Sequence, residues 1–209
     1  MQTPVYIRSL GRVPYEQTLK EMQAFNAGRS ADTSDELWLL EHPPVYTLGI
    51  NAAAEHILNA GTTPVVRTDR GGQVTWHGPG QLVVYLLLDL KRKKLGVRQL
   101  VCGMEKAVIS ALADYGIEAS GREGAPGVYV GDAKIASLGL RVRNHCSYHG
   151  LAVNVNADLD DFGGINPCGY DGLAVTRSCD LGGPTEIGSM ADALLPALLT
   201  ELDLRPATD

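Results

Sequence analysis

Cys168 lies in the stretch GGINPCGYDG (163–172), between a proline and a glycine and outside any helical or strand period. Structural cysteines are usually buried as small hydrophobic residues, whereas a thiol on a glycine- and proline-rich turn is held out on backbone that approaches other groups closely. The thiolate is the nucleophilic form, and an unperturbed thiol with a pKa of about 8.5 is mostly protonated at neutral pH. Cys168 is therefore a candidate nucleophile if the fold brings a cationic or basic group to it.

Lys134 is one such group, in an unusual place. It is the second residue of the apolar strand-like run AKIASLGLRV, which follows the Gly-Asp turn at 131–132. In one interpretation its stem packs on the strand while the ammonium reaches water. In the other it is partly desolvated, with a lowered pKa that lets it donate and accept protons. The sequence leaves both interpretations open.

The segment RGGQVTWHGPGQ (70–81) concentrates glycines around Arg70, Trp76 and His77. Its order matches neither a P-loop nor a dinucleotide-binding loop. A hairpin with a glycine bulge is one interpretation. The other is a substrate loop lined by His77 and backbone amides, because paired glycines let the backbone approach a ligand closely.

A second glycine-containing segment, HGLAVNVN (149–156), places Gly150 at the start of a strand, where it permits close approach to another backbone or to a ligand. His149 is interpreted as a hydrogen-bonded residue at a strand end rather than a ligand. No pair of histidines is spaced as H-x-x-H and no pair of the four cysteines as C-x-x-C, so no metal site is expected.

Composition bounds the class of protein. The chain has 209 residues, is 44% hydrophobic and carries a formal net charge of −6. These values predict one domain over 1–209 and argue against binding to nucleic acid, which requires a basic surface. The stretch KRKK (91–94) is a local exception, either a solvated turn or a docking patch for an acidic partner.

The same composition predicts a soluble protein. The beginning of the chain has no basic segment followed by an apolar one, so no secretory signal is expected. The longest strongly apolar run (82–90) is too short to span a bilayer. We therefore expect a cytoplasmic protein with reduced thiols and no membrane partner.

Periodicity predicts an α+β fold, with a mixed, largely antiparallel sheet and flanking helices. Short turns at 77–80 and 131–132 predict antiparallel hairpins. Helices are expected at 14–28, 52–60, 97–116 and 186–203. Strands are expected at 5–10, 36–42, 45–49, 64–69, 73–77, 81–90, 127–131, 133–142 and 150–156.

Four of these segments together resemble one family. RGGQVTWHGPGQLVVYLLLDL, DAKIASLGLRV, HGLAVNVN and GINPCG followed by VTRS occur in this order. They resemble the octanoyltransferases of lipoate biosynthesis, the lipoate-protein ligase B family, from about Tyr15 to Ser178. The resemblance implies the two-layer catalytic module shared by biotin and lipoate ligases, and we expect a monomer.

The resemblance also implies a reaction in two halves, without cofactor, metal or ATP. Cys168 corresponds to the nucleophile, which takes octanoyl from octanoyl-acyl carrier protein as a thioester. Lysines of lipoyl domains, in E2 subunits of 2-oxoacid dehydrogenases and in the glycine-cleavage H protein, then receive it. Lys134 corresponds to the second catalytic residue, which lowers the pKa of Cys168 and shuttles protons. Acyl carrier proteins are acidic as a class, which would give 91–94 a docking role.

The family's acyl-binding segments correspond to two glycine-rich loops and a strand, which we expect to form a narrow apolar slot closed at one end. Ser137 stands where the family as readily has alanine, a small-for-small change. Backbone amides, or the His77 side chain, are candidate donors to an oxyanion. The residues assigned to substrate binding are Arg70, Gly71, Gly72, Gln73, Val74, Thr75, Trp76, His77, Ser137, Leu138, Gly139, Gly150, Leu151 and Ala152.

Three other functions compete with this one. An ATP-dependent lipoate or biotin ligase on the same fold would activate a free acid as an adenylate and would not need a cysteine. A non-catalytic binding module would need neither Cys168 nor Lys134. A papain-like hydrolase would need His77 or His149 as the partner of the thiol. The cysteine in GINPCG favours the octanoyltransferase.

Overall fold

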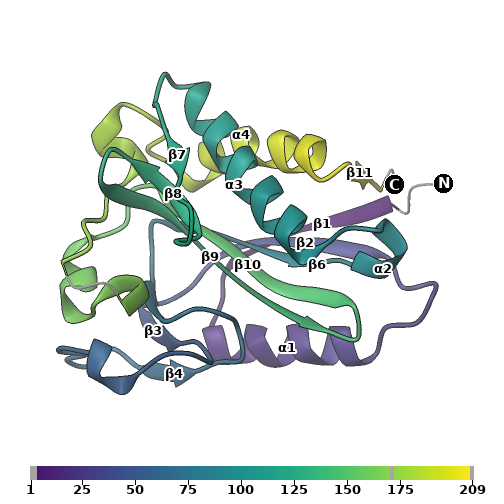
Figure 1. Cartoon of the computed structure of the whole chain (residues 1–209), viewed down its shortest axis with the longest axis horizontal. Coiled ribbons are helices and arrows are strands. Elements are labelled where there is room, and N and C mark those ends of the chain that lie inside the picture. Colours follow the sequence, from purple (N-terminus) through teal and green to yellow (C-terminus); the bar gives the residue numbers. More distant parts are fainter. Residues whose placement is uncertain (1–3, 170–171, 208–209) are drawn as a thin grey trace.

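A mixed sheet forms the centre of the computed structural model, which describes residues 4–169 and 172–207 and, within them, all side chains except that of Cys168. Among the described residues it has eight strands, in the order β11-β1-β2-β6-β10-β9-β8-β7 (Figure 1). β1 is parallel to β2 and β11, and every other neighbouring pair is antiparallel. The predicted mixed, largely antiparallel sheet is confirmed. The strands are β1 (Pro4–Arg12), β2 (Asp35–Glu41), β6 (Gln81–Leu87), β7 (Ser120–Gly121), β8 (Gly127–Val130), β9 (Ala133–Arg143), β10 (Cys146–Asn154) and β11 (Arg205–Pro206).

A smaller sheet contains β3 (Val45–Leu48) between β4 (Val65–Arg67) and β5 (Val74–His77). The predicted hairpin at 77–80 is wrong, because β5 and β6 belong to different sheets and this segment carries the chain from one to the other. Gly80 has a φ of +82°, and a Cβ there would lie 2.6 Å from the backbone nitrogen of Ala157. The hairpin at 131–132 is confirmed, since β8 and β9 are antiparallel neighbours.

Helices cover both faces of the large sheet: α3 (Val97–Ala113) and α4 (Ile187–Glu201) lie on one face and α1 (Tyr15–Ala27) on the other (Figure 1). These three helices were predicted. The helix expected at 52–60 is only a 3₁₀ turn, η1 (Ala54–His56), because so short a segment is not a stable helix without packing. Its Ile57 forms a bridge to Ile165 instead. In the described part of the chain, no helix is long and apolar enough to cross a bilayer.

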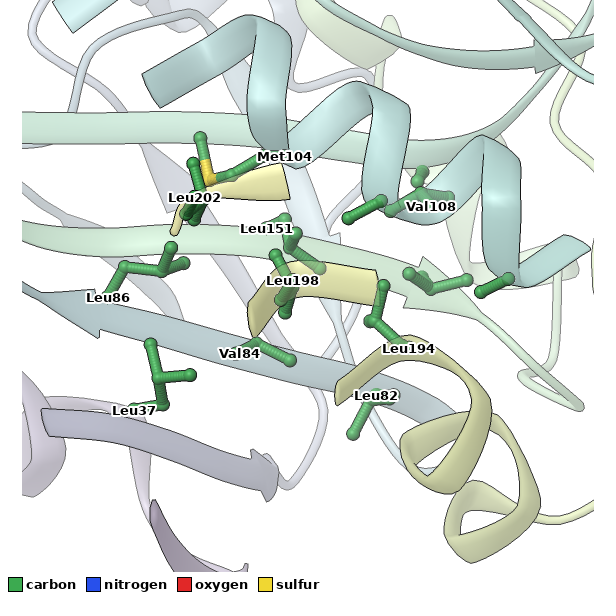
Figure 2. Close-up of a cluster of buried hydrophobic side chains, with 14 of the residues drawn as sticks. Leu37, Leu82, Val84, Leu86, Met104, Val108, Leu151, Leu194, Leu198 and Leu202 are labelled. Atoms are coloured by element: carbon green, nitrogen blue, oxygen red, sulfur yellow. The ribbon is translucent and has the colours of Figure 1, made fainter. Parts of the chain in front are cut away.

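β6 is buried on both faces, which explains its uninterrupted apolar sequence. Leu82, Val84 and Leu86 pack under α3 and α4 with Leu151 of β10 (Figure 2). The alternate residues, including Val83 and Tyr85, face α1. The two cores hold β6 and β10 at the centre of the sheet and thereby fix the strands that line the site.

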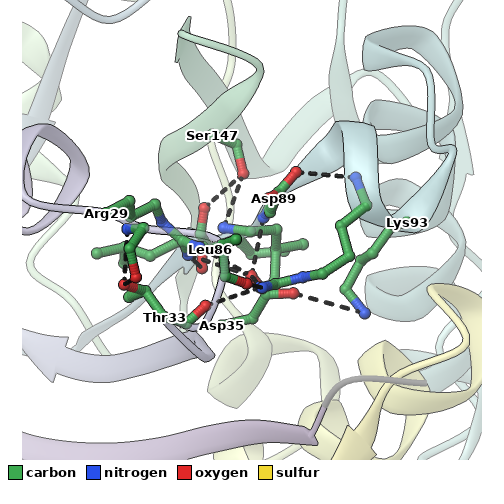
Figure 3. A network of polar contacts seen from close by, with 12 residues as sticks. Arg29, Thr33, Asp35, Leu86, Asp89, Lys93 and Ser147 are labelled. Atoms are coloured by element: carbon green, nitrogen blue, oxygen red, sulfur yellow. Dashed lines mark hydrogen bonds and ion pairs between the residues drawn. The ribbon is translucent and has the colours of Figure 1, made fainter. Parts of the chain in front are cut away.

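A short helix that the sequence did not predict, α2 (Leu90–Lys93), contains the first three cations of the basic stretch 91–94. Two of its cations turn inward to Asp35, whose side chain is fully buried (Figure 3). Arg92 Nη2 lies 2.8 Å and Lys93 Nζ 3.6 Å from the Asp35 carboxylate, and Arg29 Nη1 lies 3.1 Å from it. The stretch is therefore not simply a solvated turn, and two of its four cations serve the fold.

Candidate active site

One cavity of about 400 Å³ brings together distant parts of the sequence. It is lined from β5, β6, β9 and β10, from the loop at 70–73, from the segment 124–126 and from the first turns of α3. The predicted residues that line it are Lys134, Arg70, Gly71, Gly72, Gln73, Val74, Thr75, His77, Ser137, Leu138, Gly139, Gly150, Leu151 and Ala152.

Trp76 is the predicted binding residue that does not line this cavity. Alternation along β5 turns its neighbours Thr75 and His77 to the cavity and Trp76 to the opposite side. There its ring packs edge-on against Phe162, with 5.4 Å between centroids. Trp76 is 1% exposed and belongs to a hydrophobic core, so the structure does not bring its side chain to the cavity with the other predicted residues.

A β-bulge directs Lys134 into the cavity. Ala136 lies opposite Val128 and Lys134 opposite Tyr129, so that Ile135 is an extra residue on β9. Ile135 and Ala136 therefore both face the α3/α4 core, and Lys134 joins Ser137 at the cavity. Without the bulge, Lys134 would share the core-facing side of Ala136.

Lys134 is 3% exposed, so the interpretation with a solvated ammonium is wrong. Its Nζ donates to the carbonyl oxygen of Pro126 at 3.0 Å and lies 5.1 Å from the centroid of the Tyr129 ring. Gly127 makes room for it: a Cβ there would lie 2.6 Å from Lys134 Cε, and its φ is +144°. Glu105 of α3 accepts a hydrogen bond from the Gly127 amide at 2.9 Å, which fixes this backbone. Sequence reasoning missed Gly127 and Glu105, although a glycine at a strand start was a visible signal.

Cys168 lies in the 3₁₀ turn η3 (Pro167–Gly169), and its side chain falls outside the described atoms. Gly169 of the same turn packs on the cavity-lining Gln73, since a Cβ at Gly169 would lie 3.1 Å from Gln73 Cγ. Farther along, the Lys134 amide donates to the Ala174 carbonyl at 2.8 Å, and the Thr176 amide donates to the Lys134 carbonyl at 3.0 Å. The turn with Cys168 thus contacts the cavity wall through Gly169, and residues 174–176, later in the chain, are hydrogen bonded to the backbone of Lys134. Contact between the two side chains stays a prediction.

Glycines of the 70–73 loop and of β9 leave space for the side chain of Arg70, which is 7% exposed. Its Nη2 donates to the carbonyl and hydroxyl oxygens of Thr47, each at 2.8 Å. A Cβ at Gly139 would lie 3.1 Å from Arg70 Cδ, so the arginine stem occupies that space. The Gly71 amide donates to the Leu140 carbonyl at 2.8 Å and attaches the loop to β9.

Gly150 serves close packing between strands. A Cβ there would lie 2.1 Å from the Val84 carbonyl oxygen of β6. Of the two interpretations that the sequence left open, the structure therefore supports close approach to another backbone. The loop and strand glycines position the cavity wall, and the ligand-facing surface comes from the side chains between them.

His77 has a tautomer fixed by its neighbours. Asn154 Nδ2 donates to the Thr176 carbonyl, which leaves Asn154 Oδ1 as the acceptor for Gln81 Nε2. The other side-chain atom of Gln81, Oε1, can only accept. It therefore accepts a hydrogen bond from His77 Nδ1 at 2.6 Å. Burial lowers the pKa of His77 to about 3, so the ring is neutral and its Nε2 carries no hydrogen. His77 cannot donate to an oxyanion as expected, and backbone amides are the remaining candidates.

Further buried polar residues missed by the sequence surround His77 at the inner end of the cavity. Burial lowers the pKa of His42 to about 4, and this ring donates from Nδ1 to the Val13 carbonyl and accepts from the Tyr85 hydroxyl, each at 2.7 Å. The Tyr15 ring stacks on His77 with 5.8 Å between centroids. The spacing of the histidines in the sequence matches no known motif, so this cluster could not be predicted from the sequence.

His149 has a left-handed backbone, with a φ of +60° inside β10. This conformation turns the ring toward Tyr85 and Tyr148 instead of the α3/α4 core. His149 Nε2 lies 2.9 Å from Asp69 Oδ1, and the Tyr148 hydroxyl donates to Asp69 Oδ2. Burial raises the pKa of Asp69, but the hydrogen bonds from His149 and Tyr148 outweigh it and hold that pKa well below its usual range.

Known proteins match both the sequence and the fold. Residues 14–199 match the lipoyl protein ligase A/B catalytic domain family. An octanoyltransferase of Laribacter hongkongensis is 59% identical over 198 residues, covering 95% of this chain and 96% of the relative. An octanoyltransferase of Methylococcus capsulatus is 59% identical over 196 residues, covering 94% and 95%.

Two solved structures show the breadth of the fold. A lipoate-protein ligase A bound with ATP has a TM-score of 0.81 at 17% identity, covering 100% of this chain and 89% of that one. A biotin protein ligase from Aquifex aeolicus has a TM-score of 0.56 at 14% identity, covering 97% and 70%. These likenesses confirm the predicted ligase-like module. The similarity to the curated relatives is far higher, and the chain belongs to the lipoyl protein ligase A/B catalytic domain family and, within it, to the octanoyltransferases.

Proposed function

We propose that this acyltransferase moves an octanoyl group from octanoyl-acyl carrier protein to Cys168, and from there to a lysine of a lipoyl domain. The observation that carries the proposal is the buried side-chain nitrogen of Lys134 in a cavity whose wall contacts the turn with Cys168. All parts of this site lie within residues 1–209, which we propose act as one catalytic domain.

In the first half-reaction, Lys134 in its neutral amine form takes the proton of the Cys168 thiol and becomes the ammonium. The thiolate attacks the carbonyl carbon of the donor thioester, a new C–S bond forms, and the tetrahedral intermediate collapses with loss of the carrier thiolate. Lys134 returns the proton to that leaving group. The Pro126 carbonyl supports this role because it holds Nζ at 3.0 Å in a fixed direction.

In the second half-reaction, the neutral amine of a lipoyl-domain lysine attacks the acyl-enzyme. A C–N bond forms, the C–S bond to Cys168 breaks, and Lys134 passes the proton lost by nitrogen to the departing sulfur. Exchange between thioesters is nearly balanced in energy and amide formation from a thioester is downhill, so the sequence of steps runs without ATP. Covalent catalysis also lets the two carrier proteins dock in turn.

The cavity suits a medium-length acyl chain. Val83 and Ala152 form part of its wall, and burying the chain stabilises the complex by roughly 0.8 kcal/mol per CH₂. The outer end lies by Val97, which is 48% exposed, and the inner end by Tyr85, which is 3% exposed. We place the carbonyl carbon near Lys134, because this residue is the proton carrier of the proposed reaction, and the tail toward Tyr85.

Transfer in purified components tests the proposal and separates it from an ATP-dependent ligase. The chain is incubated with octanoyl-acyl carrier protein and an unmodified lipoyl domain, without ATP, and the mass of the lipoyl domain is followed. We expect octanoylation by the wild type and at least a hundredfold slower transfer by Cys168→Ser and Lys134→Met. Modification only from free octanoate with ATP, undiminished in Cys168→Ser, would establish the ligase instead.

A further inference from the structure

The strand register aligns three residues of the cavity wall in one row across the large sheet. Ala152 of β10 lies opposite Val83 of β6 on one side and opposite Ser137 of β9 on the other. Residues directly opposite each other on antiparallel strands present their side chains to the same face, and all three line the cavity. Neighbouring strands lie about 4.8 Å apart, so this cavity row, from Ser137 to Val83, is about 10 Å long.

The space on both sides of the cavity row is occupied. On one side lie Tyr85 of β6 and Gly139 of β9. The Arg70 stem fills the space over Gly139, where a Cβ would lie 3.1 Å from Arg70 Cδ. On the other side, Gln81 of β6 lies opposite Asn154 of β10, and a 2.9 Å hydrogen bond joins their side chains. The path that remains for an apolar chain therefore follows the cavity row across the strands.

One end of the cavity row lies at Lys134. Its Nζ donates to the carbonyl oxygen of Pro126 at 3.0 Å. The residue after Pro126 is Gly127, which lies opposite Ser137 in the β8–β9 pair. The Lys134 nitrogen is therefore at the Ser137 end of the row, and an acyl group that reacts beside Lys134 begins there.

The other end of the cavity row is closed. The residue opposite Val83 on its far side is Leu40 of β2. Leu40 is 3% exposed and shares a core with Met22 of α1, and it does not line the cavity. Val83 is the last residue of the row to line the cavity. The distance from Ser137 to this end, about 10 Å, is one that an extended eight-carbon chain spans.

We propose that Val83 sets the upper limit of acyl chain length, and that the chain lies across β9, β10 and β6 with its carbonyl carbon by Ser137 and its last carbon against Val83. The proposal rests on the proposed function, because it concerns the acyl group that Cys168 receives. Ala152 lies under the middle of the chain. A larger side chain in the cavity row therefore excludes the chains that extend past its own position.

The variant Val83→Ala tests the closed end, because it removes two carbon atoms, the difference between a decanoyl and an octanoyl group. The measured quantity is the second-order rate constant for forming the acyl adduct from octanoyl- and decanoyl-acyl carrier protein. We expect the ratio of the decanoyl to the octanoyl rate constant to rise at least fivefold over that of the wild type.

The matched control is Val84→Ala, which makes the same change at the next residue of β6. Val84 is fully buried in the core under α3 and α4 and does not line the cavity (Figure 2). Both variants leave a small void, but the ratio of rate constants in Val84→Ala should equal that of the wild type. A ratio that is unchanged in Val83→Ala, or raised equally in both variants, would overturn the proposal.

Larger side chains test the direction of the chain. Val83→Ile adds one carbon at the closed end and should slow octanoyl at least threefold relative to hexanoyl. Ala152→Val adds two carbons under the middle of the chain and should slow hexanoyl and octanoyl alike, at least fivefold relative to butanoyl. If the two variants disfavour the same chain lengths, the chain does not run from Ser137 to Val83.

A measurement on the wild type covers the case in which these variants fail to fold. An octanoyl group whose seventh carbon carries a diazirine is loaded from acyl carrier protein, the adduct is irradiated, and the labelled peptides are identified by mass spectrometry. We expect the label in β6 or in the cavity-lining residues of β5. A label found only outside these two strands, as on Val97 or Val101 of α3, would contradict the proposal.

The same experiments report separately on the proposed function. If the wild type forms no adduct from octanoyl-acyl carrier protein, the proposed function fails. If the adduct forms but neither the chain-length ratios nor the label place the tail at Val83, only this inference fails.

Discussion

Lys134 Nζ donates a 3.0 Å hydrogen bond to the carbonyl oxygen of Pro126, although Lys134 is eight residues away across a turn. Two irregularities make this contact: the extra residue Ile135 brings the lysine to the cavity side of β9, and Gly127 lets its stem pass close to β8. The ammonium is thus held by backbone. The Pro126 carbonyl thus helps to set the direction of Nζ.

Gly127→Ala should damage the site through this contact. The new Cβ would lie 2.6 Å from Lys134 Cε and 2.9 Å from the Ala136 carbonyl oxygen, at a φ of +144°. We expect a loss of about 2 kcal/mol in the free energy of unfolding from strain and crowding, and at least tenfold slower transfer. Denaturant unfolding and the transfer assay measure the two effects.

Gly131→Ala is the control for Gly127→Ala. Gly131 also has a positive φ, +54°, but a Cβ there meets nothing within 4 Å. It should lower stability by about 1 kcal/mol while leaving transfer within twofold of the wild type. If both variants transfer equally well, close approach at Gly127 does not matter for Lys134.

Stability should fall as the pH drops from 6.5 toward 4. Burial lowers the folded-state pKa of His42 to about 4 and of His77 to about 3, against about 6.5 in the unfolded chain. The stabilisation from neutral rings is full above the unfolded pKa and is lost as pH falls toward the folded values, because only the unfolded state takes up protons in that window. Two histidines give a slope of about 2.7 kcal/mol per pH unit near pH 5. Denaturant unfolding between pH 7 and 4.5 measures it.

His42→Gln isolates one of these protons. Its unfolding free energy should depend less steeply on pH, by about 1.4 kcal/mol per unit near pH 5. A slope equal to that of the wild type would show that the His42 ring titrates normally in the folded protein.

Substitutions should show that the cations in and near the basic stretch 91–94 have two different functions, one in stability and one in docking. Arg92 contacts the buried carboxylate of Asp35, so Arg92→Ala should lower the free energy of unfolding by about 2 kcal/mol, the contribution of a hydrogen bond to a buried charge. The exposed cations of this stretch and of the first turn of α3 are Lys91, Lys94 and Arg98. Replacing these three with alanine should change stability by less than about 0.5 kcal/mol.

The same triple replacement should raise KM for acyl carrier protein several-fold and weaken its dependence on salt, since the donor is acidic and the lost contacts are electrostatic. KM at 50 and 200 mM salt measures this. A salt dependence equal to that of the wild type would place the docking surface elsewhere.

Local patterns in the sequence predicted much of the fold and of the cavity wall. Period and end signals gave α1, α3, α4 and most strands, and the glycine-rich segments mark the loop and strands that line the cavity. These local patterns could not predict features that depend on tertiary structure. A bulge at Ile135 leaves no mark in an apolar run, and the turn at 77–80 has the same residues whether it joins strands of one sheet or two.

Side-chain chemistry was less predictable than position. Trp76 and His77 are adjacent, yet strand alternation sends one to a core and the other to the cavity. The donor or acceptor character of His77 depends on Gln81 and Asn154, and that of His149 on Asp69, eighty residues away in sequence. Such networks become visible only when the strands are assembled.

The most direct test of the account is the mass of the intact protein after mixing with octanoyl-acyl carrier protein in the absence of an acceptor. We expect one octanoyl adduct on the wild type that hydroxylamine removes, that is absent in Cys168→Ser, and that forms at least a hundredfold more slowly in Lys134→Met. Addition of a lipoyl domain should discharge the wild-type adduct onto the domain. Octanoylation of the domain by wild type and Cys168→Ser alike, with no adduct on either, would contradict the account.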